Sequence, residues 1–213
     1  MTNRVEHERR PPEEAGGDEP RLFIAVPLDE TSRAAVEGLV ADVRGLVEAS
    51  AREPRSQVRW VRMDGLHLTL RFLGPTDAAR IPALVRAIDD VAAATPAFDV
   101  QIRGAGAFPS AARPRTIWLA IDDGHDELTA LAARLGDRLA DEGVRRDDRP
   151  FRAHLTLARS DGRREGPLVA RTLATRAADF AATFPSDRIV LFESLTGGGP
   201  ARYMAHHEAP FRA

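Results

Sequence analysis

The sequence predicts a fold that mixes strands and helices and repeats one pattern of elements. Short apolar runs typical of strands alternate with longer segments in which apolar residues recur every three or four positions, as in helices. The order strand, helix, strand, helix, strand occurs once over residues 22–102 and again over residues 116–192. An identical tetrapeptide, HLTL, starts the second of these strands in each copy. These observations indicate an internal duplication. A parallel sheet and a duplicated α+β fold with two small sheets both satisfy them.

The first copy follows an N-terminal tail. Residues 1–20 hold six acids, three arginines and three prolines with almost no large apolar side chain, which predicts disorder. Residues 21–213 are globular in pattern and are expected to form one domain. The expected elements are a buried strand at 22–26, a helix at 36–47, a polar loop at 50–57, strands at 58–61 and 66–73, a helix at 81–91 and a strand at 98–102.

The second copy is expected to begin with a strand. Its predicted elements are a strand at 116–121, a helix at 128–139, a strand at 154–159, a helix at 167–179 and strands at 189–192 and 203–207. Residues 197–200 read GGGP. Because neither a lysine nor a helical pattern follows, we interpret them as a hairpin turn rather than a phosphate loop.

The repeated tetrapeptide carries the strongest chemical signal. It starts at His67 and again at His154, although the chain has only six histidines. Residues i and i+2 of a strand share a face, so each histidine and its threonine point one way while the leucines point into a core. If the two copies are related by a pseudo-two-fold axis, the two His-Thr pairs, His67 with Thr69 and His154 with Thr156, meet across a shared groove.

Two facing imidazoles suit acid–base chemistry near neutral pH. One can activate water while the other protonates a leaving oxygen. Each threonine hydroxyl can donate a hydrogen bond to a phosphoryl oxygen. Phosphoryl transfer requires mainly positioning and charge stabilisation, so two imidazoles, two hydroxyls and an arginine suffice without a metal ion or cofactor.

The distribution of charge also indicates an anion site. The formal net charge is −2, which argues against a general nucleic-acid binder. Residues 52–71, however, hold five arginines and two acids, and residues 145–164 hold seven arginines and three acids. Each of these basic windows surrounds one HLTL copy. All 30 basic residues are arginines, so chemistry that depends on a lysine is excluded.

Composition restricts the setting of the protein. Cysteine is absent, which excludes disulfides, thiolate metal sites and cysteine nucleophiles and agrees with a cytoplasmic location. Neither an apolar run of about 20 residues nor an N-terminal signal pattern is present, so no membrane association is expected.

With these motifs the chain resembles the 2H phosphoesterase superfamily, and within it the bacterial and archaeal RNA 2′,3′-cyclic phosphodiesterases, also called 2′-5′ RNA ligases. The resemblance covers residue 21 to about residue 211. It rests on Arg21 through Ala25, Trp60-Val61, His67 through Gly74, Gly106 through Pro109, Arg115 through Trp118, Phe151 through Arg159, Phe192 through Ser194, and Tyr203.

The resemblance implies an α+β fold of two pseudo-symmetric lobes, each a small antiparallel sheet with helices on its outer face, around a central cleft. It implies hydrolysis of a terminal 2′,3′-cyclic phosphate of RNA, or of a nucleoside 2′,3′-cyclic phosphate, to a 2′-phosphomonoester. His67 matches the proton donor to the departing 3′ oxygen, and His154 matches the proton acceptor. Thr69 and Thr156 match the phosphate-holding threonines.

Two substrate-binding residues also follow from the resemblance. Arg159 matches an arginine that contacts the substrate phosphate, and Phe72 matches a residue implicated in holding the RNA end. Strict alternation places both on the opposite strand face from the histidines. Their assignment therefore requires strand twist or a bulge near the strand end.

Other features receive structural interpretations. His206 and His207 are adjacent in a strand and therefore face opposite ways, which does not suit a metal site. The acidic segment 122–126, followed by Glu127, suits a turn that leads into a helix. Trp60 and Trp118 lie on predicted strands and are expected to pack in a core. Two functional alternatives remain, namely 2′-5′ ligation or 2′-5′ phosphodiester hydrolysis, and a nucleotide- or RNA-binding module without turnover. We expect a monomer.

Overall fold

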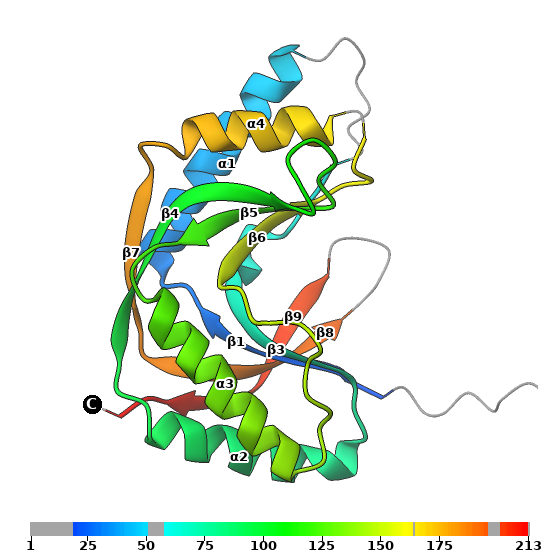
Figure 1. Ribbon diagram of the computed structural model, residues 1–213, viewed down its shortest axis with the longest axis vertical. Coiled ribbons are helices and arrows are strands. Elements are labelled where there is room, and N and C mark those ends of the chain that lie inside the picture. Colours follow the sequence, from blue (N-terminus) through cyan, green and yellow to red (C-terminus); the bar gives the residue numbers. More distant parts are fainter. Residues whose placement is uncertain (1–18, 51–57, 164, 196–200, 213) are drawn as a thin grey trace, which may run out of the picture.

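The computed structural model describes residues 19–50, 58–163, 165–195 and 201–212. Two sheets with all strand pairings antiparallel lie side by side, with two helices packed on each (Figure 1). The duplicated α+β fold is confirmed, and the parallel-sheet alternative is wrong. Most of the expected tail, residues 51–57 of the expected loop and the expected turn at 197–200 lie outside the described residues, and Ser50, expected in the loop, is the last residue of a helix.

The first sheet has the strand order β3-β1-β8-β9. These strands are β1 (Arg21–Pro27), β3 (His67–Pro75), β8 (Arg188–Leu195) and β9 (Arg202–Pro210). The first HLTL copy starts β3, which lies at an edge of this sheet. Among the residues that the structure describes, the outer edge of β3 therefore has no neighbouring strand within its own sheet.

The second sheet has the order β2-β6-β5-β4-β7. Its strands are β2 (Arg59–Trp60), β4 (Phe98–Phe108), β5 (Thr116–Ile121), β6 (His154–Arg159) and β7 (Ala181–Ser186). The second HLTL copy starts β6, whose outer edge pairs with the two residues of β2 and accepts one further backbone hydrogen bond from Val61. Both HLTL strands therefore lie at or next to the edge of a sheet.

Each sheet is covered by one helix from each copy of the repeat. Helices α1 (Glu30–Ser50) and α4 (Gly166–Arg176) pack together and contact β7 and β4 of the second sheet. Helices α2 (Ile81–Ala93) and α3 (His125–Asp141) pack together and contact β9, β8 and β3 of the first sheet. Helix α1 follows β1 but crosses to the second sheet, and α3 follows β5 but crosses to the first (Figure 1).

Strands are exchanged in the same manner. In the first sheet, the HLTL strand β3 pairs with β1, and β1 pairs with β8 from the other half of the chain. In the second sheet, the HLTL strand β6 pairs with β5, and β5 pairs with β4 from the other half. The two lobes are therefore not the two halves of the sequence, although equivalent strands hold equivalent places.

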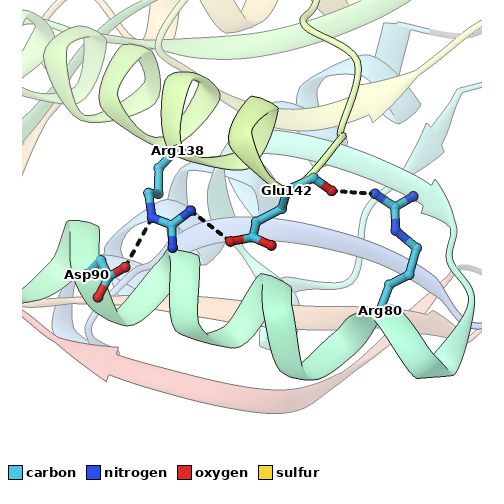
Figure 2. Close-up of polar contacts among 4 residues, drawn as sticks. All are labelled: Arg80, Asp90, Arg138 and Glu142. Atoms are coloured by element: carbon cyan, nitrogen blue, oxygen red, sulfur yellow. Dashed lines mark hydrogen bonds and ion pairs between the residues drawn. The ribbon is translucent and has the colours of Figure 1, made fainter.

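Polar contacts fix the α2–α3 pair (Figure 2). Arg138 on α3 donates to Asp90 on α2 at 3.0 Å and to Glu142 at 2.8 Å. Arg80, which precedes α2, donates to the backbone carbonyl of Glu142 at 2.9 Å. The C-terminal end of α3 is thus tied to α2 at two points.

The apolar spacing of the sequence explains the core. On α3, the four residues at helical spacing are fully buried, namely Leu128, Leu131, Leu135 and Leu139. On the strands, the leucines of both HLTL copies are buried as alternation predicts. No helix in the described part of the chain is long and apolar enough to cross a membrane.

Two elements differ from expectation. Strand β7 was not predicted, because AATFPS has a single large apolar residue, Phe184, and a proline; both suit a sheet edge, where β7 lies. Strand β4 continues six residues beyond the predicted end to Phe108. Its extension contains Gly104 at φ 82°, where the pairing with β5 shifts register.

Candidate active site

The two HLTL strands line one cleft. Strands β3 and β6 contact each other where the two sheets meet. The cleft beside them has a volume of about 1400 Å³. His67 and Thr69 line it from the first sheet, and His154 and Thr156 line it from the second. The predicted meeting of the two His-Thr pairs at one groove is therefore what the structure has.

A bulge in β3 brings Phe72 to the same cleft. Thr69 pairs with Ala25 of β1, but the next pair joins Arg71 to Ile24, so Leu70 is an extra residue in β3. Leu70 and Arg71 are consequently both buried, and Phe72 is 64% exposed and lines the cleft.

An equivalent bulge in β6 brings Arg159 to the cleft. Thr156 pairs with Trp118 of β5, whereas the next pair joins Ala158 to Ile117, so Leu157 is the extra residue. Leu157 and Ala158 are both fully buried, and Arg159 is exposed and lines the cleft. The condition that the sequence set for Phe72 and Arg159, a bulge between threonine and strand end, is met in both copies.

Each histidine ring is held in the same way. The Nδ1 atom of His67 lies 2.7 Å from the backbone carbonyl oxygen of Gly65, and Nδ1 of His154 lies 2.7 Å from that of Arg152. Since a carbonyl oxygen only accepts, Nδ1 carries the hydrogen in both rings. Nε2 of each ring is then the atom that takes up or releases a proton.

His67 is surrounded by aromatic rings. The ring of Phe23 lies 4.7 Å away, Phe192 lies 6.0 Å away, and Tyr203 meets His67 edge-on at 5.0 Å and 88°. Burial lowers the pKa of His67, and the bond to the Gly65 carbonyl opposes this shift. The neutral ring is therefore the favoured form before an anion enters.

His154 has a smaller aromatic contact and a charged neighbour. Phe108 meets its ring edge-on at 5.2 Å and 88°, and Trp118 lies 6.1 Å away. Burial lowers the pKa of His154, and the positive charge of Arg159 lowers it further, against the bond to the Arg152 carbonyl. A negatively charged ligand would raise the pKa of both histidines.

The two walls of the cleft differ in chemistry although their strands are equivalent. Phe72 pairs with Phe23 in the first sheet, and at the matching place Arg159 pairs with Thr116 in the second. The wall beside His67 is therefore aromatic, and the wall beside His154 is polar and cationic. This difference favours one sense of entry for a ligand that has an apolar end and an anionic end.

The lining of the cleft is strongly positive. Seven arginines and two aspartates line it, namely Arg21, Arg71, Arg115, Arg146, Arg149, Arg152, Arg159, Asp137 and Asp147. Both aspartates are already paired, Asp147 with Arg71 and Asp137 with Arg146. The excess of five positive charges attracts anions, although the whole chain has a net charge of −2.

Two residues of this site, Tyr203 and Phe108, contributed to the family resemblance but were given no role from the sequence. Tyr203, the only tyrosine, comes from β9 and packs its ring on Gly65, where an added Cβ would lie 2.7 Å from the ring. Phe108 comes from the unpredicted end of β4. In the sequence, Gly65 is the one sign that another group packs closely beside His67, but a glycine does not reveal which side chain that is.

The structural interpretations of the adjacent histidines, the acidic segment and Trp60 are confirmed, whereas Trp118, expected in a core, is half-buried and lies against Phe108 and His154. His206 pairs with Glu193 of β8, and His207 pairs with Asp89 of α2, so they face opposite ways. Asp126 and Glu127 lie in the first turn of α3. Trp60 packs against the core. In the described ranges, three or more His, Cys, Asp or Glu side chains do not gather in a way that could hold a metal ion.

Known proteins resemble this chain in sequence and fold. The sequence profile of the 2′-5′ RNA ligase superfamily matches residues 32–198. The RNA 2′,3′-cyclic phosphodiesterase of Archaeoglobus fulgidus is 33% identical over 150 residues, 70% of this chain and 77% of that protein. The enzyme of the same name from Thermus thermophilus is 35% identical over 145 residues, 65% of this chain and 68% of that protein.

Solved structures agree on the fold. Escherichia coli LigT complexed with 3′-AMP superimposes with a TM-score of 0.68 at 24% identity, covering 91% of this chain and 99% of that chain. A Thermus thermophilus protein superimposes with a TM-score of 0.68 at 26% identity, covering 90% of this chain and 98% of that chain.

Proposed function

Because the chain belongs to the 2′-5′ RNA ligase superfamily, we propose that it is an RNA 2′,3′-cyclic phosphodiesterase that produces 2′-phosphomonoester ends. Relatives at up to 35% identity carry that name. The observation that carries the proposal is the convergence of both His-Thr pairs on one cationic cleft. Binding alone would use the arginines and would not need two imidazoles held in matching tautomers.

The placement of the histidines suits in-line displacement at phosphorus. In such a reaction, the attacking and leaving oxygens occupy opposite sides of the phosphorus atom. His67 and His154 lie on opposite walls, so each can serve one of these oxygens. Their Nδ1 atoms remain bonded to backbone carbonyls throughout, which leaves both Nε2 atoms for proton transfer.

We assign the proton donor to His67 and the proton acceptor to His154. Nε2 of His154 takes a proton from water as the water oxygen bonds to phosphorus. The bond from phosphorus to the 3′ oxygen breaks, and that oxygen takes the proton from Nε2 of His67. The phosphate stays on the 2′ oxygen, and proton exchange with solvent restores both histidines.

The remaining residues position the substrate. The hydroxyls of Thr69 and Thr156 donate to the non-bridging phosphoryl oxygens, and the guanidinium of Arg159 neutralises charge on the phosphate. Phe72 offers an exposed ring against which the terminal nucleoside packs. The cationic wall then holds the phosphate and the aromatic wall holds the nucleoside.

We also propose that the protein acts without a metal cofactor, as a monomer, and in the cytoplasm. The two imidazoles and the arginines supply both proton transfer and charge stabilisation. The site brings all the side chains assigned to the reaction together within one chain, so the reaction does not require a second copy. A cytoplasmic location agrees with an RNA substrate and with a chain that has no cysteine.

Single histidine variants test the proposed function. His67→Ala and His154→Ala are each expected to lower kcat on a nucleoside 2′,3′-cyclic phosphate by about two to four decades. The double variant should lose little more, because both groups act in one step. His206→Ala, which removes a histidine outside the cleft, is the matched control and should keep full activity. Wild-type rates in either single variant, or tight binding without turnover in the native protein, would contradict the proposal.

A further inference from the structure

The cleft is larger than the proposed reaction requires. Small-molecule sites usually measure about 300–1,000 Å³, and this cleft measures about 1400 Å³. Beyond the histidines it continues between one face of α3 and the segment of residues 146–152, which leads from α3 into β6. We call this extension the α3 groove. It contains neither of the histidines nor the threonines of the HLTL motifs.

Helix α3 presents mostly small side chains to this groove. The leucines on its inner face are buried, and the residues that line the groove are Thr129, Ala132, Ala133, Gly136 and Asp137. A Cβ added at Gly136 would meet nothing within 4 Å. Glycine inside a helix costs about 1 kcal/mol relative to alanine, and here no tight packing explains it. The short side chains on this face of α3 leave room for a ligand, and Asp137 is the acidic residue among them.

The opposite side of the groove carries uncompensated positive charge. Arg149 and Arg152 line it, and in the described part of the chain neither forms an ion pair with a carboxylate. The two aspartates nearby are neutralised, since Asp137 is paired with Arg146 and Asp147 with Arg71. Arginine forks without carboxylate partners suit phosphate oxygens.

Both sides of the groove are fixed before a ligand arrives. The side chain of Arg71, which is buried, pairs with Asp147 at 2.5 Å and donates to the carbonyl oxygen of Arg145. These contacts attach the 146–152 segment to β3. The C-terminal end of α3 is held to α2 through Arg138 and Glu142 (Figure 2). Because the groove is already formed, little binding free energy is lost in ordering its residues when a ligand binds.

We propose that the α3 groove binds the sugar-phosphate backbone of the nucleotides that precede the reacting RNA end. This inference rests on the proposed function. The arginines of the groove can bind phosphates, and the short side chains of α3 allow the RNA backbone to approach the helix closely. Its side chains include few groups suited to base edges, so binding is independent of sequence. The preferred substrate is then an oligoribonucleotide rather than a mononucleotide.

The test compares two substrates across three variants. The substrates are a nucleoside 2′,3′-cyclic phosphate and a tetraribonucleotide ending in the same cyclic phosphate. Gly136→Gln fills the groove, and Arg149→Ala removes one phosphate contact. Ala130→Gln places the same side chain on α3 at an exposed position that does not line the cleft, and it serves as the matched control.

We expect wild-type kcat/KM to be higher for the tetranucleotide. Gly136→Gln and Arg149→Ala should each reduce that advantage by about tenfold, and Gly136→Gln should leave the mononucleotide kinetics unchanged. For the tetranucleotide, Arg149→Ala should also reduce the slope of log KM against log salt by about 0.7. Ala130→Gln should behave as wild type on both substrates.

The possible failures are distinguishable. If the native protein turns over neither substrate, the proposed function is wrong. If it turns over both with equal kcat/KM, or if the two groove variants leave the ratio unchanged, the α3 groove is not an RNA site and the proposed function stands. If Gly136→Gln impairs both substrates equally, the groove belongs to the site of the terminal nucleotide and the inference is overturned.

Discussion

Replacing Gly65 by alanine is expected to disable the protein without touching any side chain assigned to the reaction. The backbone carbonyl of Gly65 accepts the hydrogen bond from Nδ1 of His67 at 2.7 Å. That bond sets the orientation and tautomer of the proposed proton donor. A shift of Gly65 is therefore transmitted directly to Nε2 of His67.

The size of the shift follows from the packing of Tyr203. A Cβ at residue 65 would lie 2.7 Å from Cδ2 and 3.2 Å from Cε2 of the Tyr203 ring, and ordinary contact begins at 3.4 Å. Either residue 65 or the ring must move by about 0.7 Å. The ring is held edge-on by Phe23 and by His67, each at 5.0 Å, so the backbone shares the displacement. A misplacement of about 1 Å can cost roughly 100-fold in rate, and we expect kcat to fall by about 10- to 100-fold.

The assay is kcat on a nucleoside 2′,3′-cyclic phosphate as a function of pH. The Gly65 bond opposes the lowering of the His67 pKa, so a weaker bond should lower that pKa further. One limb of the profile should then move to lower pH. Gly45→Ala is the control, because a Cβ there meets nothing within 4 Å in the helix α1. Wild-type kcat with an unmoved profile in Gly65→Ala would refute the role given to this carbonyl.

Three further results are expected. The profile of kcat/KM against pH should be bell-shaped with its optimum below about 6.5, because burial lowers the pKa of both His67 and His154 in the free protein; an optimum well above 7 would contradict this. Arg159→Lys should lower turnover without moving either limb, whereas Arg159→Ala should raise the pKa of His154, since it removes a charge that lowers it; identical profiles for the two variants would exclude this coupling. The contribution of His67 to the free energy of unfolding should be fully present above about pH 6.5. It should be lost as the pH falls through the lowered folded-state pKa of His67, because the unfolded chain binds a proton at higher pH than the folded chain does. Denaturant titrations of His67→Gln should therefore show a smaller decrease in stability over that pH range.

The sequence was sufficient to predict the position of the two HLTL strands. The spacing of leucines in HLTL requires the histidine and threonine to share a face, and the structure has that arrangement in both copies. The strands β5 and β6 begin and end where the apolar pattern does. Local alternation is a reliable guide because one buried face restricts the register of a strand.

Bulges and long-range pairings could not be predicted in the same way. Alternation alone places Phe72 and Arg159 on the wrong face, and only the extra residues Leu70 and Leu157 re-aim them. The apolar periodicity of the sequence identifies strands but does not show which strands pair, so the exchange of strands between the lobes could not be predicted from it. Tyr203 reaches His67 from β9 through that exchange, so its role follows from the fold rather than from any nearby motif.

The central claim is that His67 protonates the 3′ oxygen while His154 activates water, with no metal ion required. Phosphorus NMR of the product from a ribonucleoside 2′,3′-cyclic phosphate, recorded with the protein in EDTA, tests it most directly. The account predicts complete conversion to the 2′-phosphate. Formation of the 3′-phosphate would show that the donor and acceptor are reversed relative to the ribose, and loss of conversion in EDTA that Zn²⁺ or Mn²⁺ restores would contradict the mechanism itself.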